Sequence, residues 1–356
     1  MEQKTTTVSV ADLEALVIAA LTKCGMSEAD ARTTCDVLVT TDTMGVLTHG
    51  VKALRGYVRR LRGGGLKAKA VPRIESEGPT WAIIDGQSAV GMVTSVFAMN
   101  TAIAKAKQSG MAYVGARNSC HFGPAGYYAL MAAKAGMIGM AMANDYPSMV
   151  VPGAKKPVLG TNPFAYAAPA GQEDPVFLDI ASAAVAGGKV RIYQALNKTV
   201  PDTWLVDKDG VPTTDPFMYP QNASLMPFAG HKGYGIAMMI DIFSGLLSGG
   251  ASRWEIKSWI DDDPSWETHH AAAFIAIDVG QITPLDVFEK RMDETIRDIR
   301  QTPTAKGSKQ VYLPGGIEWE KRREAIQNGI PFTDDVIESL QGLVKDLDMN
   351  VGWLST

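Results

Sequence analysis

Apolar positions recur at helical spacing through residues 1–62 and predict three helices. The first covers the stretch SVADLEALVIAALTKCG and ends at Gly25, and the second opens with Ser27 as its N-cap and ends at Gly45. The third is expected to begin with Thr48 as its cap, and a triple glycine ends it. The residues predicted to form its buried face are Val51, Leu54, Val58 and Leu61.

From residue 73 onward, short apolar runs alternate with amphipathic stretches, which predicts an α/β segment followed by a helical C-terminus. The ranges expected to form strands are 73–91 (strand, turn and strand), 111–117, 137–145, 158–169, 175–181 and 271–279. The ranges expected to form helices are 95–110, 124–135, 183–198, 230–250, 284–301, 318–328 and a last one capped by Thr333. Residues 205–216 are rich in turn formers and are expected to form a loop. One face of the 230–250 helix is predicted to comprise Ile236, Met239, Ile240, Phe243 and Leu247.

The composition is that of an ordinary globular protein, with 46% hydrophobic and 20% charged residues. The net charge is −4 and no block of basic residues is present, which argues against a nucleic-acid partner. The three cysteines form no CxxC pair and suit a reducing compartment. The N-terminal stretch lacks an apolar core of signal-peptide length, and no apolar run is long enough to span a membrane. We therefore expect a cytoplasmic protein that does not enter a membrane.

The sequence has only five histidines, and two of them stand before predicted helices. His121 follows a predicted strand, and Pro124 suits the first turn of the next helix. The unpaired N–H groups of a helix N-terminus carry partial positive charge, which favours a neutral imidazole. Such a histidine can hydrogen-bond an oxygen of a substrate or cofactor, or it can satisfy backbone groups of its own loop. The sequence leaves both roles open.

His49 directly follows Thr48 at the start of the third predicted helix. The Thr48 hydroxyl can hydrogen-bond the imidazole, or it can simply cap the helix. A histidine that titrates near neutral pH is the usual proton donor for the reduction of a carbonyl group. Two histidines at two helix starts, in a chain that is poor in histidine, suggest a shared role.

Glycines surround Lys232 at the start of the 230–250 helix, in the stretch PFAGHKGYGIAM. Exposed N–H groups, the helix dipole and the ammonium would point the same way there, as in an anion site. A tightly packed helix start gives the same pattern. The GxxxxGK[ST] spacing of a P-loop is absent, and no GxGxxG follows a predicted strand, so the P-loop and Rossmann fingerprints are both missing.

Three polar residues at the ends or breaks of apolar runs are further candidates. Asn162 could contact an amide or a ribose, Asp145 could orient a base or bind a hydroxyl, and Asp179 lies in a similar place deeper in an apolar run. Each of them could instead be a turn or bulge residue. His269 and His270 have no carboxylate or cysteine at metal-ligand spacing, so we expect a solvated loop there and no metal site.

Taken together, these stretches resemble the type-2 malate/L-lactate dehydrogenase family, whose members reduce 2-oxo acids or oxidise 2-hydroxy acids with NAD or NADP. That family also includes ureidoglycolate and sulfolactate dehydrogenases, diketogulonate reductase and cyclic-ketimine reductases. The resemblance covers nearly the whole chain. The segments that carry it are THGV (48–51), RNSCHFGPAGYYA (117–129), LGTNPFAYAAP (159–169), LDIASAAVAGGKV (178–190), GHKGYGIAMMIDIFSGLLSG (230–249), FIAIDVGQITPLDVF (274–288) and YLPGGIEWEKRREAIQNGIP (312–331).

The resemblance implies an α/β fold that is not Rossmann. A dinucleotide-binding domain with a largely antiparallel sheet, residues 73–309, would be inserted into a helical domain built from residues 1–72 and 310–356. The resemblance also implies a homodimer with its site near the subunit interface.

By similarity, the site would use two histidines. His49 would be the proton donor to the carbonyl, with Thr48 relaying to it, and Asp145 falls where relatives carry a polar site residue. His121 would line the nicotinamide site or take the acid/base role itself. The residues expected to contact NAD or NADP are His121, Phe122, Gly123, Pro124, Ala125, Thr161, Asn162, Leu178, Asp179, Ile180, His231, Lys232, Gly233, Lys306 and Gly307.

Three positions depart from the family pattern. Thr48 replaces a frequent serine, Cys120 a frequent asparagine, and Ala53 an arginine that holds the substrate carboxylate in many relatives. Lys52 and Arg55 are the nearby cations that could take over this contact. The alternative activity in the same family is reduction of a cyclic ketimine, and a binding protein without turnover is the alternative from another class.

Overall fold

The computed structural model describes residues 5–354, and a seven-stranded sheet lies at its centre. Its strand order is β2, β3, β4, β11, β5, β6, β7, and β3–β4 is the one parallel pair among the described strands of this sheet. The bounds are β2 Arg73–Gly78, β3 Trp81–Asp85, β4 Met111–Ser119, β5 Met137–Ala143, β6 Phe164–Ala168, β7 Val176–Ile180 and β11 His270–Asp278. The expected mixed α/β fold with a largely antiparallel sheet is confirmed.

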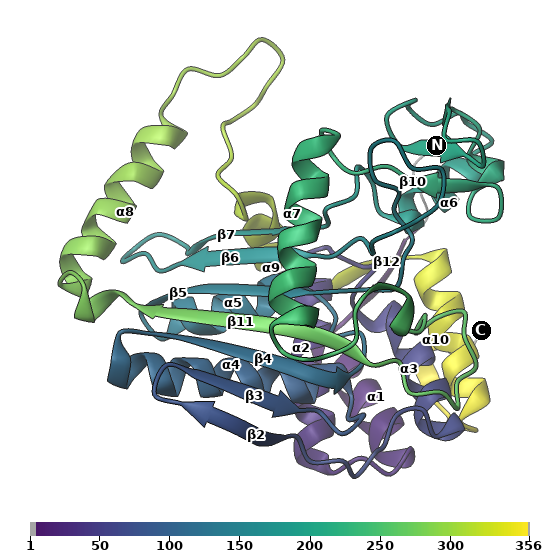
Figure 1. The fold of residues 1–356 in the computed structure, drawn as a ribbon, viewed down its shortest axis with the longest axis horizontal. Helices are drawn as coiled ribbons and strands as arrows, with labels where there is room; N and C mark the ends of the chain where they lie inside the picture. Colours follow the sequence, from purple (N-terminus) through teal and green to yellow (C-terminus); the bar gives the residue numbers. More distant parts are fainter. Residues whose placement is uncertain (1–4, 355–356) are drawn as a thin grey trace.

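Helices cover both faces of this sheet (Figure 1). α4 (Gly91–Ser109) and α5 (Ala125–Lys134) pack on one face and begin before and after β4. α7 (His231–Asp241) crosses the other face, where Ile240 packs on Met142 and Ala273. Both faces are therefore apolar along the central strands, which explains why 271–279 reads as a continuous apolar run.

Segments from both ends of the chain form a helical layer beside α4 and α5 (Figure 1). Its helices are α1 Val10–Lys23, α2 Glu28–Thr43, α3 Leu54–Gly63, α9 Gly316–Asn328 and α10 Asp334–Asp346. β1 (Thr5–Val8) pairs antiparallel with β12 (Ile330–Thr333), two strands that the sequence did not predict. One apolar core runs from α1 through α5 to β11. The predicted domain boundaries at residues 72 and 310 therefore cut through a shared core and stay a prediction.

A small unit packs at one end of the sheet. It contains α6 (Gly187–Ala195), which is shorter than the expected 183–198 helix, and a three-stranded sheet of β8 (Leu205–Asp207), β9 (Pro212–Thr213) and β10 (Ala223–Leu225). The expectation of a loop at 205–216 is wrong. Leu205 is buried, and the Asp207 carboxylate accepts hydrogen bonds from Asp209 and Val211 N–H, which closes a hairpin turn.

The starts of α2 and α3 show which of the predicted helix caps are correct. Ser27 caps α2 as predicted, since its hydroxyl accepts a 3.1 Å hydrogen bond from Asp30 N–H. Thr48 does not cap the third helix: a 3₁₀ turn, η1 (Val51–Ala53), precedes α3 and has no side-chain cap. The predicted buried face of that helix is confirmed.

The prediction for the 230–250 helix is wrong in part. α7 passes into a π-helical segment, η3 (Ile242–Leu246), whose longer turn rotates the following side chains. Ile240 is buried as expected, but Met239 and Leu247 are exposed.

α8 (Leu285–Arg300) stands at the edge of the molecule and leads into an exposed loop. Among the described residues, no helix combines the length and apolarity needed to cross a membrane.

Candidate active site

His49 and His121 lie side by side, with their ring centroids 5.6 Å apart. His49 comes from the turn between α2 and η1, and His121 comes from the segment between β4 and α5. Both residues are half-buried. The structure therefore brings together the two histidines that the sequence placed before separate helices.

The imidazole of His49 is oriented by its neighbour in the chain. Thr48 Oγ1 and His49 Nδ1 are 2.9 Å apart and share a hydrogen bond. Thus the Thr48 hydroxyl orients the ring, instead of capping a helix as the sequence suggested. Burial lowers the pKa of His49, and the negative charge of Asp145 opposes this effect.

His121 is held from two sides by aromatic residues. The hydroxyl of the fully buried Tyr57 is hydrogen-bonded to His121 Nδ1 at 2.6 Å. The indole of Trp259 stacks on the imidazole with a centroid distance of 4.3 Å and an interplanar angle of 14°. Burial, together with the nearby His49 and His270, sets the pKa of His121 well below its ordinary value. Burial is the largest of these causes.

Asp145 lies just after β5 and forms a hydrogen bond with a third histidine. Its Oδ1 atom is 3.0 Å from Nε2 of His270, the first residue of β11 and a buried side chain. The expectation of a solvated loop at His269 and His270 is therefore wrong for His270. The pairing of β11 with β4 brings it there, since His270 lies opposite Ser119, two residues before His121.

Asn162 is fully buried and acts on the backbone around Asp145. Its side-chain oxygen accepts a 3.1 Å hydrogen bond from Asp145 N–H, and its amide donates to Ala237 O at 3.0 Å. These contacts show a side chain that positions the Asp145 turn. A direct contact of Asn162 or the adjacent Thr161 with a cofactor stays a prediction.

Asp42 of α2 is a site residue that the sequence did not reveal. It is buried, and its Oδ2 atom accepts a 2.8 Å hydrogen bond from Val51 N–H. A Cβ atom on Gly50 would stand 1.8 Å from Asp42 Oδ1, so only glycine fits beside this carboxyl. Burial raises the pKa of Asp42 well above its ordinary value. Asp42 and Gly50 together fix the turn that carries His49.

The predicted cofactor residues fall into two neighbouring groups. Phe122 turns its ring into the core, and Gly123 adopts a positive φ of 77°, which lets the chain turn from His121 into α5. Asp179, on β7 with Leu178 and Ile180, accepts a 2.7 Å hydrogen bond from Gly126 N–H near the start of α5. The remaining members of this first group, Pro124 and Ala125, are buried.

The second group stands at the start of α7. His231 and Lys232 are exposed, whereas Gly233 is buried, and a Cβ on it would lie 2.3 Å from Phe228 O. Phe228 N–H donates to Ser182 O at 3.0 Å, so this helix start lies beside the segment that follows β7. Gly233 therefore serves close packing, as one of the two alternatives predicts, and Lys232 is open to solvent. An anion site at this helix start stays a prediction.

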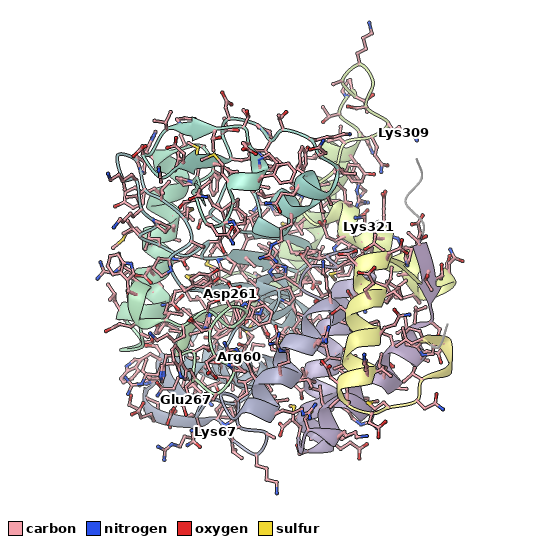
Figure 2. The ribbon with its side chains drawn as sticks, turned by 90° about the vertical axis from the view of Figure 1, so that its right-hand side faces the viewer. Arg60, Lys67, Asp261, Glu267, Lys309 and Lys321 are labelled. Carbon is pink, nitrogen blue, oxygen red and sulfur yellow. The ribbon has the colours of Figure 1, made fainter. Side chains whose placement is uncertain are left out.

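Four predicted residues make no hydrogen bond or ring contact with either histidine among the described residues. Lys306 and Gly307 are in the exposed loop between α8 and α9, whose Lys309 projects from the body in Figure 2. Lys52 pairs with Asp335 and Arg55 with Asp346, both carboxylates of α10. Both cations are engaged in ion pairs with this helix. That Lys52 or Arg55 binds the substrate carboxylate in place of the arginine missing at Ala53 stays a prediction.

Comparisons with known proteins identify the family of the chain. The family model described as malate/L-lactate dehydrogenase matches residues 8–341, and the chain belongs to this family. A malate dehydrogenase of Pyrococcus horikoshii is 35% identical over 94% of this chain and 93% of its own length. The ureidoglycolate dehydrogenase (NAD(+)) of Escherichia coli is 36% identical over 92% of this chain and 93% of its own. The solved structure of sulfolactate dehydrogenase from Methanocaldococcus jannaschii superposes with a TM-score of 0.90, at 33% identity, over 97% of this chain and 98% of that one.

Proposed function

We propose that this protein is an NAD- or NADP-dependent oxidoreductase that interconverts a 2-hydroxy acid and the corresponding 2-oxo acid. The observation that carries the proposal is the pair of imidazoles 5.6 Å apart, each hydrogen-bonded through Nδ1 to a hydroxyl. This leaves the Nε2 atom of both rings for a substrate oxygen. In line with the family, we also propose a homodimer, and a cofactor-binding part at residues 73–309.

The residues around the pair fit a nicotinamide cofactor. His270 Nδ1 is a buried polar atom without a hydrogen-bond partner among the described residues. Asp179 offers a carboxylate of the kind that binds ribose hydroxyls, and Lys232 offers an ammonium for a phosphate. When bound, a nicotinamide accepts hydride from the hydroxy acid or returns it to the oxo acid.

The chain itself moves the proton. In the oxidation direction, neutral His49 accepts the hydroxyl proton at Nε2, while Thr48 holds the ring through Nδ1. In the reduction direction the same nitrogen returns a proton to the carbonyl oxygen. His121 is held by Tyr57 and directs its Nε2 atom to the same oxygen or to the nicotinamide. Asp145 favours the imidazolium that forms on His49.

The test is a coupled assay of a panel of 2-hydroxy and 2-oxo acids with each cofactor, followed by absorbance of the reduced nicotinamide. A cyclic imino acid in the same panel separates ketimine reduction. Removing a positioned acid/base costs about 10²–10⁴-fold in turnover, so we expect His49→Ala and His121→Ala to lose about that much while cofactor affinity changes little. His269→Asn is the control, since this nearby residue bonds no member of the pair. Full turnover in both alanine variants would refute the proposal.

A further inference from the structure

Arg60 of α3 is a fully buried arginine (1% exposed) that forms no ion pair with a carboxylate of residues 5–354. Its guanidinium donates instead to five main-chain carbonyl oxygens of one loop, residues 258–266. The acceptors are the carbonyl oxygens of Ser258 (2.6 Å), Trp259 (2.6 Å), Asp262 (3.2 Å), Asp263 (3.4 Å) and Trp266 (3.0 Å). A guanidinium has five N–H donors, so this loop accounts for all of them. Five carbonyl dipoles thereby compensate a charge that is costly to bury.

The surface of α3 is shaped for this loop. Gly56, Arg60 and Gly63 recur at the spacing of one helix face. A Cβ on Gly56 would lie 2.9 Å from the Trp259 ring, and one on Gly63 would lie 2.8 Å from the backbone of Pro264. The loop therefore lies directly against the helix on both sides of Arg60.

An ion pair also holds the C-terminal end of the loop. Lys67 and Glu267 form an ion pair of 2.5 Å just beyond residue 266. Figure 2 shows Arg60 between Asp261 of the loop and this ion pair. The path of the loop is thus fixed from inside by Arg60 and at its end by Lys67.

The loop delivers one side chain to the histidines. Trp259 stacks on His121 at 4.3 Å and on Tyr57 at 5.1 Å. Because the indole lies on one face of the imidazole, it excludes water from that face and restricts rotation of the ring. The carbonyl oxygen of Trp259 itself is one of the two acceptors closest to the Arg60 guanidinium, at 2.6 Å.

We propose that Arg60 is a positioning residue of the active site, which acts through the 258–266 loop to hold Trp259 against His121. Arg60 contacts neither histidine, and its influence passes through the loop. The kinetic part of this proposal rests on the proposed function. The effect on His121 itself does not.

The groups that face His121 define what Trp259 changes. Tyr57 approaches from α3, His49 from the turn after α2, and His270 from β11. The buried Cys120 precedes His121, and Asp145 acts on the neighbouring His49. Burial is the largest cause of the lowered pKa of His121, so a displaced indole should let that pKa rise toward its ordinary value.

The experiment titrates the histidines by NMR in protein labelled with ¹³C at the imidazole Cε1, and His121→Gln assigns the signal. Two variants disturb the indole by different routes. Arg60→Lys removes the planar set of hydrogen-bond donors. Gly56→Ala adds a Cβ atom that displaces the Trp259 ring. We expect each to raise the pKa of His121 by about half a unit to one unit and to lower kcat/KM for hydroxy-acid oxidation. Arg59→Lys, an exposed neighbour on the same helix, is the control.

The Trp259→Ala background decides between direct and indirect action. If Arg60 acts through the indole, Arg60→Lys causes no further shift of the His121 titration in that background. An additional shift of similar size there would overturn the proposal, and so would an unchanged His121 titration in folded Gly56→Ala and Arg60→Lys proteins. Because the NMR titration needs no turnover, failure of the proposed activity leaves this result interpretable.

Discussion

Replacing Tyr57 by phenylalanine tests how His121 is held. The substitution keeps the ring that stacks 5.1 Å from Trp259 and removes only the hydroxyl that lies 2.6 Å from His121 Nδ1. Burial raises the pKa of Tyr57 well above its ordinary value, so this phenol keeps its proton and can donate a hydrogen bond to His121 Nδ1. In that arrangement His121 carries its own proton on Nε2, the atom that the proposed mechanism directs to the substrate.

The size of the effect follows from this burial. A buried polar atom left without its partner costs about 1–3 kcal/mol, and 1.4 kcal/mol corresponds to tenfold in rate. If most of this cost falls on the transition state, kcat/KM drops about 10- to 100-fold. The free energy of unfolding should fall by about 1–3 kcal/mol, because the substitution leaves His121 Nδ1 without this partner.

The assay compares steady-state kinetics and urea unfolding of Tyr57→Phe with those of Tyr113→Phe. Tyr113 donates a 2.7 Å hydrogen bond to Phe243 O, away from the histidines. We therefore expect the control to lose comparable stability and to keep its turnover. Equal kcat/KM values for Tyr57→Phe and the unaltered protein would refute this account of His121.

Three further predictions concern the surroundings of His49. In the proposed mechanism, hydroxy-acid oxidation requires neutral His49, so its rate is full above the pKa of His49 and falls as the pH drops through that value. Asp145→Asn removes a charge that raises this pKa, and the acidic limb of a kcat/KM profile should therefore move to lower pH. Gly50→Ala places a Cβ against the Asp42 carboxyl and should lower both turnover, at least tenfold, and the urea midpoint; an unchanged midpoint would contradict the steric argument. We expect Lys52→Gln to change the KM for the acid substrate by no more than about twofold, because the Lys52 ammonium pairs with Asp335 of α10. A large rise in KM would instead show that Lys52 binds the substrate.

Local patterns predicted the parts of the fold that neighbours in sequence determine. Ser27 was identified as a cap because a serine before an amphipathic run satisfies N–H groups only three residues away. β1 and β12 were missed because each is short and pairs only with the opposite end of the chain. The hairpin at 205–213 was missed because its strands are a few residues long between turn formers.

The candidate site divides in the same way. Thr48, His49 and His121 could be found because histidines are rare in this chain and each stands at an element boundary. Tyr57 could not be found, because it lies on the apolar face of α3, where an aromatic side chain is ordinarily part of the core. Trp259 and His270 approach from segments far along the chain, and no local pattern predicts a contact between such residues.

The most direct test of the central claim is a crystal structure with NADH and oxamate, an unreactive analogue of a 2-oxo acid. The account predicts the oxamate oxygen within hydrogen-bond distance of Nε2 of His49, with His121 Nε2 facing the same ligands and the nicotinamide beside them. A ternary complex in which the inhibitor lies away from both imidazoles would contradict it.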